Sequence, residues 1–145
     1  MAEHDEIHDS PTGWVAKHIQ NYVETDGDSG HDWYGVSALL LTTRGRKSGL
    51  KRRTGLYYGK DGDHYIVVAS RGGHDKHPAW YLNLVEEPAV DVQVGADKFA
   101  AVAHTADAEE KARLWPLMAA IFPMYEQFQA KTVRDIPVVV LVPTR

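Results

Sequence analysis

The chain has 145 residues, of which 43% are hydrophobic and 25% are charged. These proportions are typical of a folded domain and exclude a disordered or fibrous chain, so we expect residues 1–145 to form a single domain. Cysteine is absent, which excludes disulfide bonds, a thiol nucleophile and cysteine-ligated zinc or iron–sulfur sites.

The N-terminal region is acidic. Residues 1–32 hold eight acidic side chains against a single cation, Lys17, and anionic lipid repels such a segment. The sequence also lacks a secretory h-region and an apolar run of the roughly 18 residues that span a bilayer. We therefore expect a cytoplasmic protein, at most peripheral to a membrane, with no stable membrane insertion.

The positive charge gathers in one short stretch. Six cations and no acid lie between Arg44 and Arg53, whereas the net charge of the chain is −4, so the remainder carries −10. Like charges at this density repel one another, and they favour either a solvated hairpin or an anionic partner.

The chain begins with a polar segment, residues 1–11, which we expect to be disordered. Apolar residues then recur at helical spacing and predict an amphipathic helix over residues 12–24 that packs on the main domain. The apolar stripe of this helix consists of Trp14, Val15, His18, Ile19, Tyr22 and Val23.

Six β-branched or alternating segments predict strands, the first three joined as an antiparallel meander and the next two as a hairpin. In chain order they cover residues 36–43, 52–59, 64–71, 89–94, 98–105 and 136–142. A short helix is predicted with Pro78 in its first turn and Pro88 beyond its end. A second helix is predicted from Asp107 to about Phe122, where Glu110 completes a capping box and Pro116 kinks or divides the helix, and a further turn or two continues through Tyr125 and Phe128. The pattern favours an α+β fold with a small, closed or half-closed β-barrel.

The turn Arg44–Gly49 is the clearest candidate binding element. Its two glycines let backbone N–H groups converge among guanidinium, ammonium and hydroxyl groups, a donor set that suits phosphate. The turn matches neither a P-loop nor a dinucleotide-binding glycine motif. The alternatives are a solvated hairpin and a single-stranded nucleic-acid site with Tyr57 or Trp80 as a stacking residue, although the net charge of −4 counts against nucleic acid.

The segment from the end of the third predicted strand to the next helix contains residue types that bind metal ions or act as nucleophiles in other proteins. His74 and His77 are spaced for a metal ion, but no third ligand is evident and Lys76 lies between them, so we expect no metal site. Ser70 lacks the nucleophile-elbow pattern of a hydrolase.

An aromatic triplet follows in the C-terminal third. Phe122, Tyr125 and Phe128 recur every three residues and would project from one side of a helix. Such a stripe forms either core packing or one wall of a pocket for a flat ligand, and composition does not decide between the two.

Three long segments resemble the deazaflavin-dependent nitroreductase family, small split-β-barrel reductases that use coenzyme F420 (8-hydroxy-5-deazaflavin). The segments are LLLTTRGRKSGLKRRTGLYYG, VVASRGGHDKHPAWYLNL and FPMYEQFQAKTVRDIPVVVLVP. The resemblance extends from about Trp14 to Pro143. It implies a six-stranded, mainly antiparallel split β-barrel like that of FMN-binding proteins, with an N-terminal helix and inserted helices, and a monomer or weak dimer.

The resemblance also implies residue roles. The coenzyme has a phosphodiester and an oligoglutamate tail, which would give the basic stretch an anionic partner. The residues implied to bind it are Arg46, Lys47 and Ser48 at the phosphate and tail, Arg52, Arg53, Thr54, Gly55, Leu56 and Tyr57 beside the coenzyme, Val68, Ala69, Ser70 and Arg71 along the ring, and Lys76, Ala79, Trp80, Tyr81, Leu82 and Asn83 at a helix start that favours anions. Phe122, Tyr125 and Phe128 would form the pocket of a small aromatic acceptor, and Tyr125, Tyr57 or Ser70 would donate a proton or polarise the acceptor.

The implied function is transfer of a hydride from reduced F420 to a planar, electron-poor acceptor. Phe122 and Phe128 stand where some family members have tyrosines, which predicts an apolar pocket that prefers quinones, enones and coumarin- or aflatoxin-like lactones to nitroaromatics. Gly55 stands where many relatives have proline, which would loosen that strand. The alternatives are an FMN-dependent split-barrel oxidoreductase, whose single phosphate needs fewer cations, and a non-catalytic F420 carrier.

Overall fold

The computed structural model describes residues 6–11 and 13–145. Within these ranges the chain forms nine strands and four α-helices. The strands are β1 (Ile7–Asp9), β2 (Asp32–Trp33), β3 (Val36–Arg44), β4 (Lys51–Tyr57), β5 (Gly59–Asp61), β6 (His64–Val68), β7 (Ala89–Val94), β8 (Asp97–Thr105) and β9 (Val138–Pro143). The helices are α2 (Gly13–Thr25), α3 (Ala79–Glu86), α4 (Ala108–Ile121) and α5 (Met124–Ala130), and a short 3₁₀ turn, η1, covers Arg71–Gly73.

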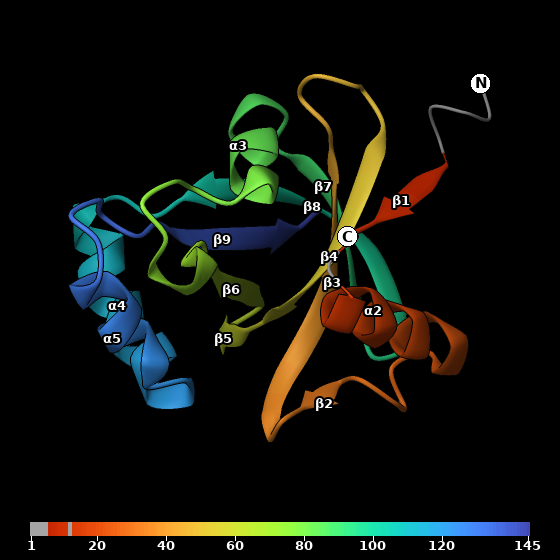
Figure 1. Ribbon diagram of the computed structural model, residues 1–145, viewed down its shortest axis with the longest axis horizontal. Helices are drawn as coiled ribbons and strands as arrows, with labels where there is room; N and C mark the ends of the chain where they lie inside the picture. Colours follow the sequence, from red (N-terminus) through yellow and green to blue (C-terminus); the bar gives the residue numbers. More distant parts are fainter. Residues whose placement is uncertain (1–5, 12) are drawn as a thin grey trace.

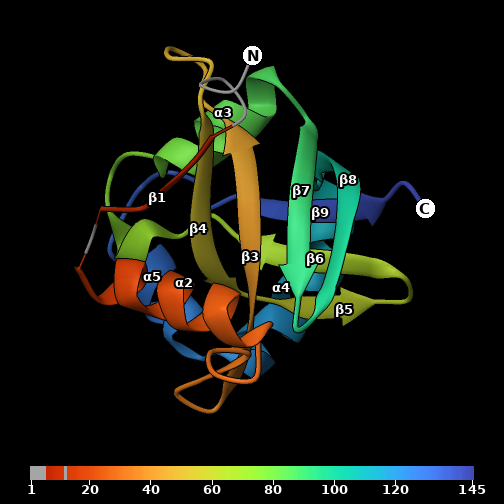
Figure 2. The same ribbon diagram turned by 90° about the vertical axis from the view of Figure 1, so that its right-hand side faces the viewer.

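The strands form one sheet in the order β1-β4-β3-β7-β8-β9-β6-β5, with β2 paired to β3 at the side. The β1–β4 pair is parallel and the other pairs are antiparallel. The sheet is strongly curved, and Figures 1 and 2 show β3, β4 and β7 crossing the direction of β6 and β9. This curvature encloses the main hydrophobic core between the two halves of the sheet.

The α+β class and the six predicted strands are confirmed, as β3, β4 and β6 to β9. The predicted number of strands is wrong, because three short strands add to these six. One of them, β1, lies in the segment expected to be disordered and pairs with the edge of β4, where Ser10 N–H also donates to Arg53 O at 2.9 Å. A short polar segment shows no alternation, so its pairing has no sequence pattern to reveal it. Residues 1–5 of that segment lie outside the described residues.

Strand β3 supplies side chains to two different clusters, because successive residues of a strand point to opposite faces. Leu39 and Leu41 are buried in the main core. Leu40 points to the other face and packs against Ile19 and Tyr22 of α2. Helix α2 therefore covers the outer face of β3 and β4, as Figure 2 shows.

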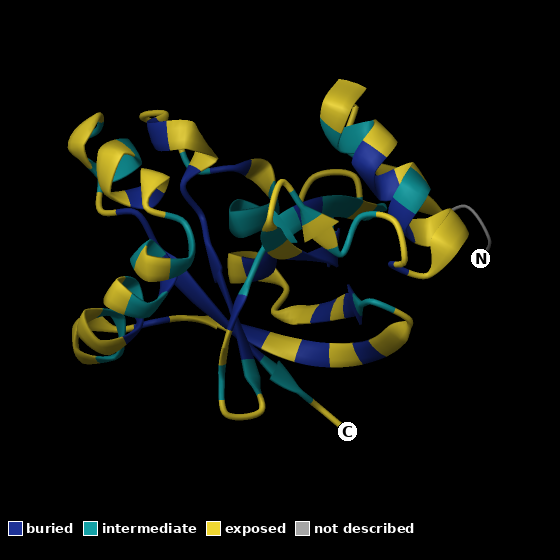
Figure 3. Ribbon diagram, turned by 90° about the horizontal axis from the view of Figure 1, so that it is seen from below, coloured by how far each residue is buried: buried dark blue, intermediate teal, exposed yellow. Residues whose placement is uncertain are grey.

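Helix α2 is held to the sheet by Tyr22, which is fully buried. Its hydroxyl lies 3.0 Å from Ala38 O and 3.3 Å from Gln93 O, and it accepts a hydrogen bond from Gly95 N–H at 2.6 Å. The helix was predicted over residues 12–24, and one stripe of it is buried against the sheet (Figure 3). The predicted stripe is too wide, since Trp14 is 64% exposed.

The helices of the second half begin and end close to the predicted positions. The Asp107 side chain accepts a hydrogen bond from Glu110 N–H at 2.8 Å, which confirms the predicted N-cap of α4. Pro116 does not divide α4, which continues to Ile121 because Leu114 and Met118 are buried on both sides of the proline. No helix of the described ranges is long and apolar enough to cross a bilayer.

Replacing Tyr22 with Phe tests how strongly α2 is held. The variant leaves the part-buried N–H of Gly95 without its acceptor and removes the buried hydrogen bond to Ala38 O, and an unsatisfied buried group costs about 1–3 kcal/mol. We expect the free energy of unfolding in urea to fall by that amount. Tyr34→Phe is the control, because Tyr34 is 86% exposed, and its stability should match that of the parent chain. Equal stability of the two variants would contradict the anchoring role.

Candidate functional site

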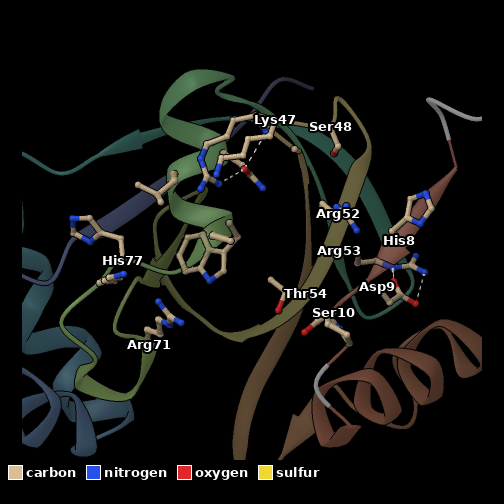
Figure 4. Close-up of a pocket in the computed structure, with 18 residues that line it drawn as sticks. His8, Asp9, Ser10, Lys47, Ser48, Arg52, Arg53, Thr54, Arg71 and His77 are labelled. Carbon is tan, nitrogen blue, oxygen red and sulfur yellow. Dashed lines mark hydrogen bonds and ion pairs between the residues drawn. The ribbon is translucent and has the colours of Figure 1, made fainter.

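A pocket of about 800 Å³ opens between β4, the β3–β4 turn, the loop after β6 and the start of α3 (Figure 4). Residues of β1 and the segment after it close one side. The lining residues are His8, Asp9, Ser10, Pro11, Gly45, Arg46, Lys47, Ser48, Arg52, Arg53, Thr54, Arg71, Lys76, His77, Ala79, Trp80, Leu82 and Asn83.

Positive charge dominates this pocket. Among the described residues that line it, the cationic ones are Arg46, Lys47, Arg52, Arg53, Arg71 and Lys76. The lining has one carboxylate, Asp9, which is already engaged in an ion pair with Arg53 at 2.6 Å. Such a concentration of cations favours a ligand that carries several negative charges.

The β3–β4 turn, which we call the basic hairpin (residues 44–53), is closed by its own backbone. Gly45 N–H donates to Leu50 O at 2.7 Å, and Gly49 N–H donates to Gly45 O at 2.8 Å. A Cβ at position 45 would lie 2.7 Å from Ser48 Oγ, and Gly49 has a φ of +72°. Both glycines are therefore needed for the hairpin to present its donors on one side.

Asn83 connects the basic hairpin to α3. Its side-chain oxygen accepts hydrogen bonds from Arg46 N–H at 3.1 Å and from Arg46 Nη1 at 3.0 Å, while its nitrogen donates to Thr43 Oγ1 at 3.2 Å. Asn83 is 4% exposed. It was predicted to contact the coenzyme, and the structure gives it a position from which it orients Arg46 in the pocket.

The residues of β4 that were predicted to lie beside the coenzyme have different surroundings. Thr54 and Arg52 line the pocket, whereas Leu56, further along the strand, packs against the main core. Gly55 faces α2, where a Cβ would lie 2.5 Å from Nδ1 of His18. Glycine at this position therefore has a packing reason in the fold, since any side chain would collide with His18.

His18 is buried between α2 and the sheet. Its Nε2 lies 2.8 Å from Gly30 O, and its ring stacks on Trp33 with the ring centroids 3.7 Å apart. Nδ1 has no hydrogen-bond partner in the described part of the chain. Burial lowers the pKa of His18, because the charged form would lose its solvation.

The segment after β6 brings only some of its predicted residues to the pocket. Val68, Ala69 and Ser70 are buried and lie outside the lining, whereas Arg71 points into it with a φ of +46°. Further along, Lys76 of the same loop and Ala79, Trp80 and Leu82 of α3 line the pocket. Tyr81 does not, since its hydroxyl is 2.9 Å from Thr105 Oγ1.

The three predicted acceptor residues form an aromatic cluster outside this lining. Phe122 ends α4, whereas Tyr125 and Phe128 lie on α5, so the triplet crosses a helix break and the single-helix prediction is wrong. The ring centroid of Phe122 lies 5.0 Å from that of Tyr125, 6.2 Å from that of Phe128 and 4.9 Å from that of Tyr57. We call Tyr57 and these three residues the aromatic wall.

The hydroxyl groups of the aromatic wall stay protonated. Tyr125 is 4% exposed, and burial raises the pKa of its phenol well above the ordinary value. Burial also raises the pKa of Tyr57. At neutral pH both phenols are therefore hydrogen-bond donors.

The sequence did not predict His8, Asp9, Ser10, Pro11 and His77 as lining residues. The indication that it offered for the first four is the acidic N-terminus, where Asp9 pairs with Arg53 of the basic hairpin. His77 was considered as a metal ligand, but its Nδ1 lies 3.1 Å from Arg134 Nη1. No group of three or more metal-ligating side chains occurs among the residues with described positions.

Comparison with known proteins places this geometry in a family. Residues 14–143 match the model of a family described as F420H(2)-dependent quinone reductase. The chain is 40% identical over 141 residues to an F420H(2)-dependent quinone reductase of Mycobacterium tuberculosis, which covers 88% of this chain and 95% of that protein.

Solved structures agree with this assignment. One described as an F420-H2-dependent reductase is 39% identical, with a TM-score of 0.67, and covers 72% of this chain and 92% of its own. A second, described as a domain-swapped dimer, is 38% identical, with a TM-score of 0.70, and covers 91% and 99%. The heme storage protein HutZ of Vibrio cholerae shares the fold alone, with 17% identity, a TM-score of 0.60, and coverage of 74% and 82%. The chain therefore belongs to the F420H(2)-dependent quinone reductase family, and it is an oxidoreductase that uses coenzyme F420.

Proposed function

We propose that this chain transfers a hydride from reduced coenzyme F420 to planar, electron-poor acceptors, and that it prefers quinones, enones and coumarin- or aflatoxin-like lactones to nitroaromatics. The observation that carries the proposal is a cationic pocket and an aromatic wall built on the same strand. β4 contributes Thr54 to the pocket and, three residues later, Tyr57 to the wall.

The donor set of the pocket fits the anionic end of the coenzyme. The basic hairpin offers Arg46, Lys47 and Ser48 to a phosphodiester and carboxylates, and Arg52 extends the positive surface along β4. Thr54, Arg71 and Trp80 line the part of the pocket away from the hairpin tip, where we place the ring. Residues of the prediction that lie behind this lining, such as Leu56 and Val68, would support the ring through the backbone.

The bound coenzyme supplies a hydride from C5, and the acceptor takes up that hydride and one proton, so that a quinone becomes a hydroquinone. The protein orients the acceptor, which makes the reaction effectively unimolecular. We propose that Tyr125, Tyr57 or Ser70, or a water that one of them holds, donates the proton or polarises the acceptor. Because burial raises the pKa of Tyr125, that phenol stays protonated at neutral pH and can donate a hydrogen bond that polarises the acceptor.

Acceptor preference follows from the side chains of the aromatic wall. Phe122 and Phe128 have no hydroxyl, so the wall offers few hydrogen-bond donors to a nitro group. Large apolar rings contact flat acceptors over their whole area. A wall of this composition favours quinones and other planar carbonyl compounds.

Two finer features of architecture belong to the same proposal. The sheet order ends at β5 and begins at β1, with β4 and β6 not paired to each other among the described strands, an arrangement that supports a split rather than a closed β-barrel. The similarity to a chain described as a domain-swapped dimer favours the dimeric form of the expected monomer or weak dimer.

Replacing Lys47 with Ala tests the position of the anionic end. A charge-assisted hydrogen bond contributes about 1.5–3 kcal/mol, and exposure of this side chain reduces that value. We expect the dissociation constant of the coenzyme, measured by titration of its fluorescence, to rise roughly tenfold at low salt. Lys98→Ala is the control, because Lys98 pairs with Asp26 outside the pocket. Equal dissociation constants for the two variants would show that the anion lies elsewhere.

Acceptor preference is measured with the reduced coenzyme and a panel of acceptors, by following its reoxidation. We expect kcat/KM for a simple naphthoquinone to exceed that for a nitroimidazole by at least about tenfold, which corresponds to about 1.4 kcal/mol in the transition state. The double variant F122Y/F128Y should narrow this ratio, because it adds two hydroxyl groups. A nitroimidazole that reacts faster than the quinone would contradict the preference.

A further inference from the structure

The loop after β6 is held from behind by one arginine of the segment between α5 and β9. Arg134 Nε donates to His74 O at 2.7 Å, and Nη2 donates to Ser70 O at 2.7 Å. Nη1 donates to Ala69 O at 3.2 Å and lies 3.1 Å from His77 Nδ1. One guanidinium therefore bonds to four residues of the loop that supplies Arg71 and Lys76 to the pocket.

Arg134 is itself held in place by its own segment. Gln129 Nε2 donates to Arg134 O at 2.8 Å, and Gln129 Oε1 accepts from Ile136 N–H at 3.0 Å. Thr132 Oγ1 lies 3.2 Å from Asp75 Oδ1, which adds a second connection to the loop. Hydrogen bonds therefore hold both the backbone carbonyl and the guanidinium group of Arg134.

The loop needs such support because its backbone is unfavourable. Arg71, Gly72 and Gly73 have φ values of +46°, +62° and +82°. The left-handed region is costly for a residue with a Cβ, as Arg71 is, and such a conformation persists only when its surroundings impose it. Gly73 also packs tightly on α5, where a Cβ would lie 2.7 Å from Phe128 O.

The bonds of Arg134 are unusual for an arginine at such a site. In the described part of the chain it makes no ion pair with a carboxylate, and its partners are three carbonyl groups and an imidazole nitrogen. A forked guanidinium can serve several acceptors at fixed angles, which an ammonium group cannot do. The guanidinium of Arg134 therefore fixes the backbone direction of Ala69 and Ser70 after β6, and with it the position of Arg71.

We propose that Arg134 is a positioning residue that aligns the coenzyme ring with the acceptor. The proposal rests on the proposed function, which places the ring beside Thr54, Arg71 and Trp80. The segment of Arg134 continues directly from α5, which carries Tyr125 and Phe128 of the aromatic wall. Arg134 thereby ties the loop on the coenzyme side and the wall on the acceptor side into one rigid unit.

The test compares two ligands, the complete coenzyme and its deazaflavin ribityl fragment, which lacks the phosphodiester and the glutamates. In Arg134→Gln we expect the dissociation constants of both ligands to rise by the same factor, at least tenfold, because the ring end is misplaced. In Lys47→Ala only the complete coenzyme should bind more weakly. A residue that merely stabilised the fold would lower the unfolding temperature when replaced, and would leave both dissociation constants unchanged wherever the chain remains folded.

Two further variants keep the test decisive. Arg113→Gln removes one cation that pairs with Asp61 at 2.9 Å, away from the pocket, and should bind both ligands as the parent chain does. Arg134→Lys keeps the charge and serves if the glutamine variant fails to fold, as thermal unfolding will show. It should remain defective toward both ligands, because an ammonium group cannot bond to all four acceptors.

The possible results distinguish a failure of the proposed function from a failure of the role assigned to Arg134. If the parent chain binds neither ligand, the proposed function is wrong, and the role of Arg134 falls with it. If the parent chain binds both ligands and Arg134→Gln behaves as Arg113→Gln does, only the role of Arg134 is wrong. Full recovery of binding in Arg134→Lys would likewise overturn the positioning role, since charge alone would then suffice.

Discussion

Mutual repulsion among the cations of one pocket is the constraint on which the structure of this protein depends. Six cationic side chains line the pocket in the described chain, and its single carboxylate, Asp9, is already bound to Arg53. Like charges this close oppose folding unless a partner neutralises them. Uncharged hydrogen-bond acceptors hold some of these cations in place, and the side-chain oxygen of Asn83, which accepts from Arg46, is the clearest example. In the proposed function, the anionic coenzyme neutralises an arrangement that is otherwise electrostatically unfavourable.

The aromatic wall and the loop after β6 are held together by contacts with α5 and the segment that follows it. Pro123 separates Phe122 from α5, so the aromatic wall comes from two helices that meet beside Tyr57. The loop that enters the pocket lies against α5 at Gly73 and is bonded to Arg134. In the proposed function, the coenzyme pocket and the acceptor wall therefore belong to one packed unit, which suits a reaction that requires two flat molecules to be held face to face.

Local patterns predicted the main elements, and long-range contacts account for what they missed. The continuous apolar run of β3, the alternation in β8 and the cap at Asp107 are local properties, so the sequence was sufficient to predict them. The pairing of β1 with β4 and the fork of Arg134 join residues more than forty positions apart, which no periodicity reveals. The family resemblance named residues such as Leu56 and Tyr81 by position, and the structure shows that they lie outside the lining.

A crystal structure of this chain with oxidised coenzyme F420 tests the central claim most directly. The account predicts that the phosphodiester and the first glutamate carboxylates lie within hydrogen-bond distance of Arg46, Lys47 or Arg52, with the ring beside Thr54 and Arg71. A coenzyme whose acidic end lies away from residues 44–53, or whose ring lies on the far side of β4, would contradict it.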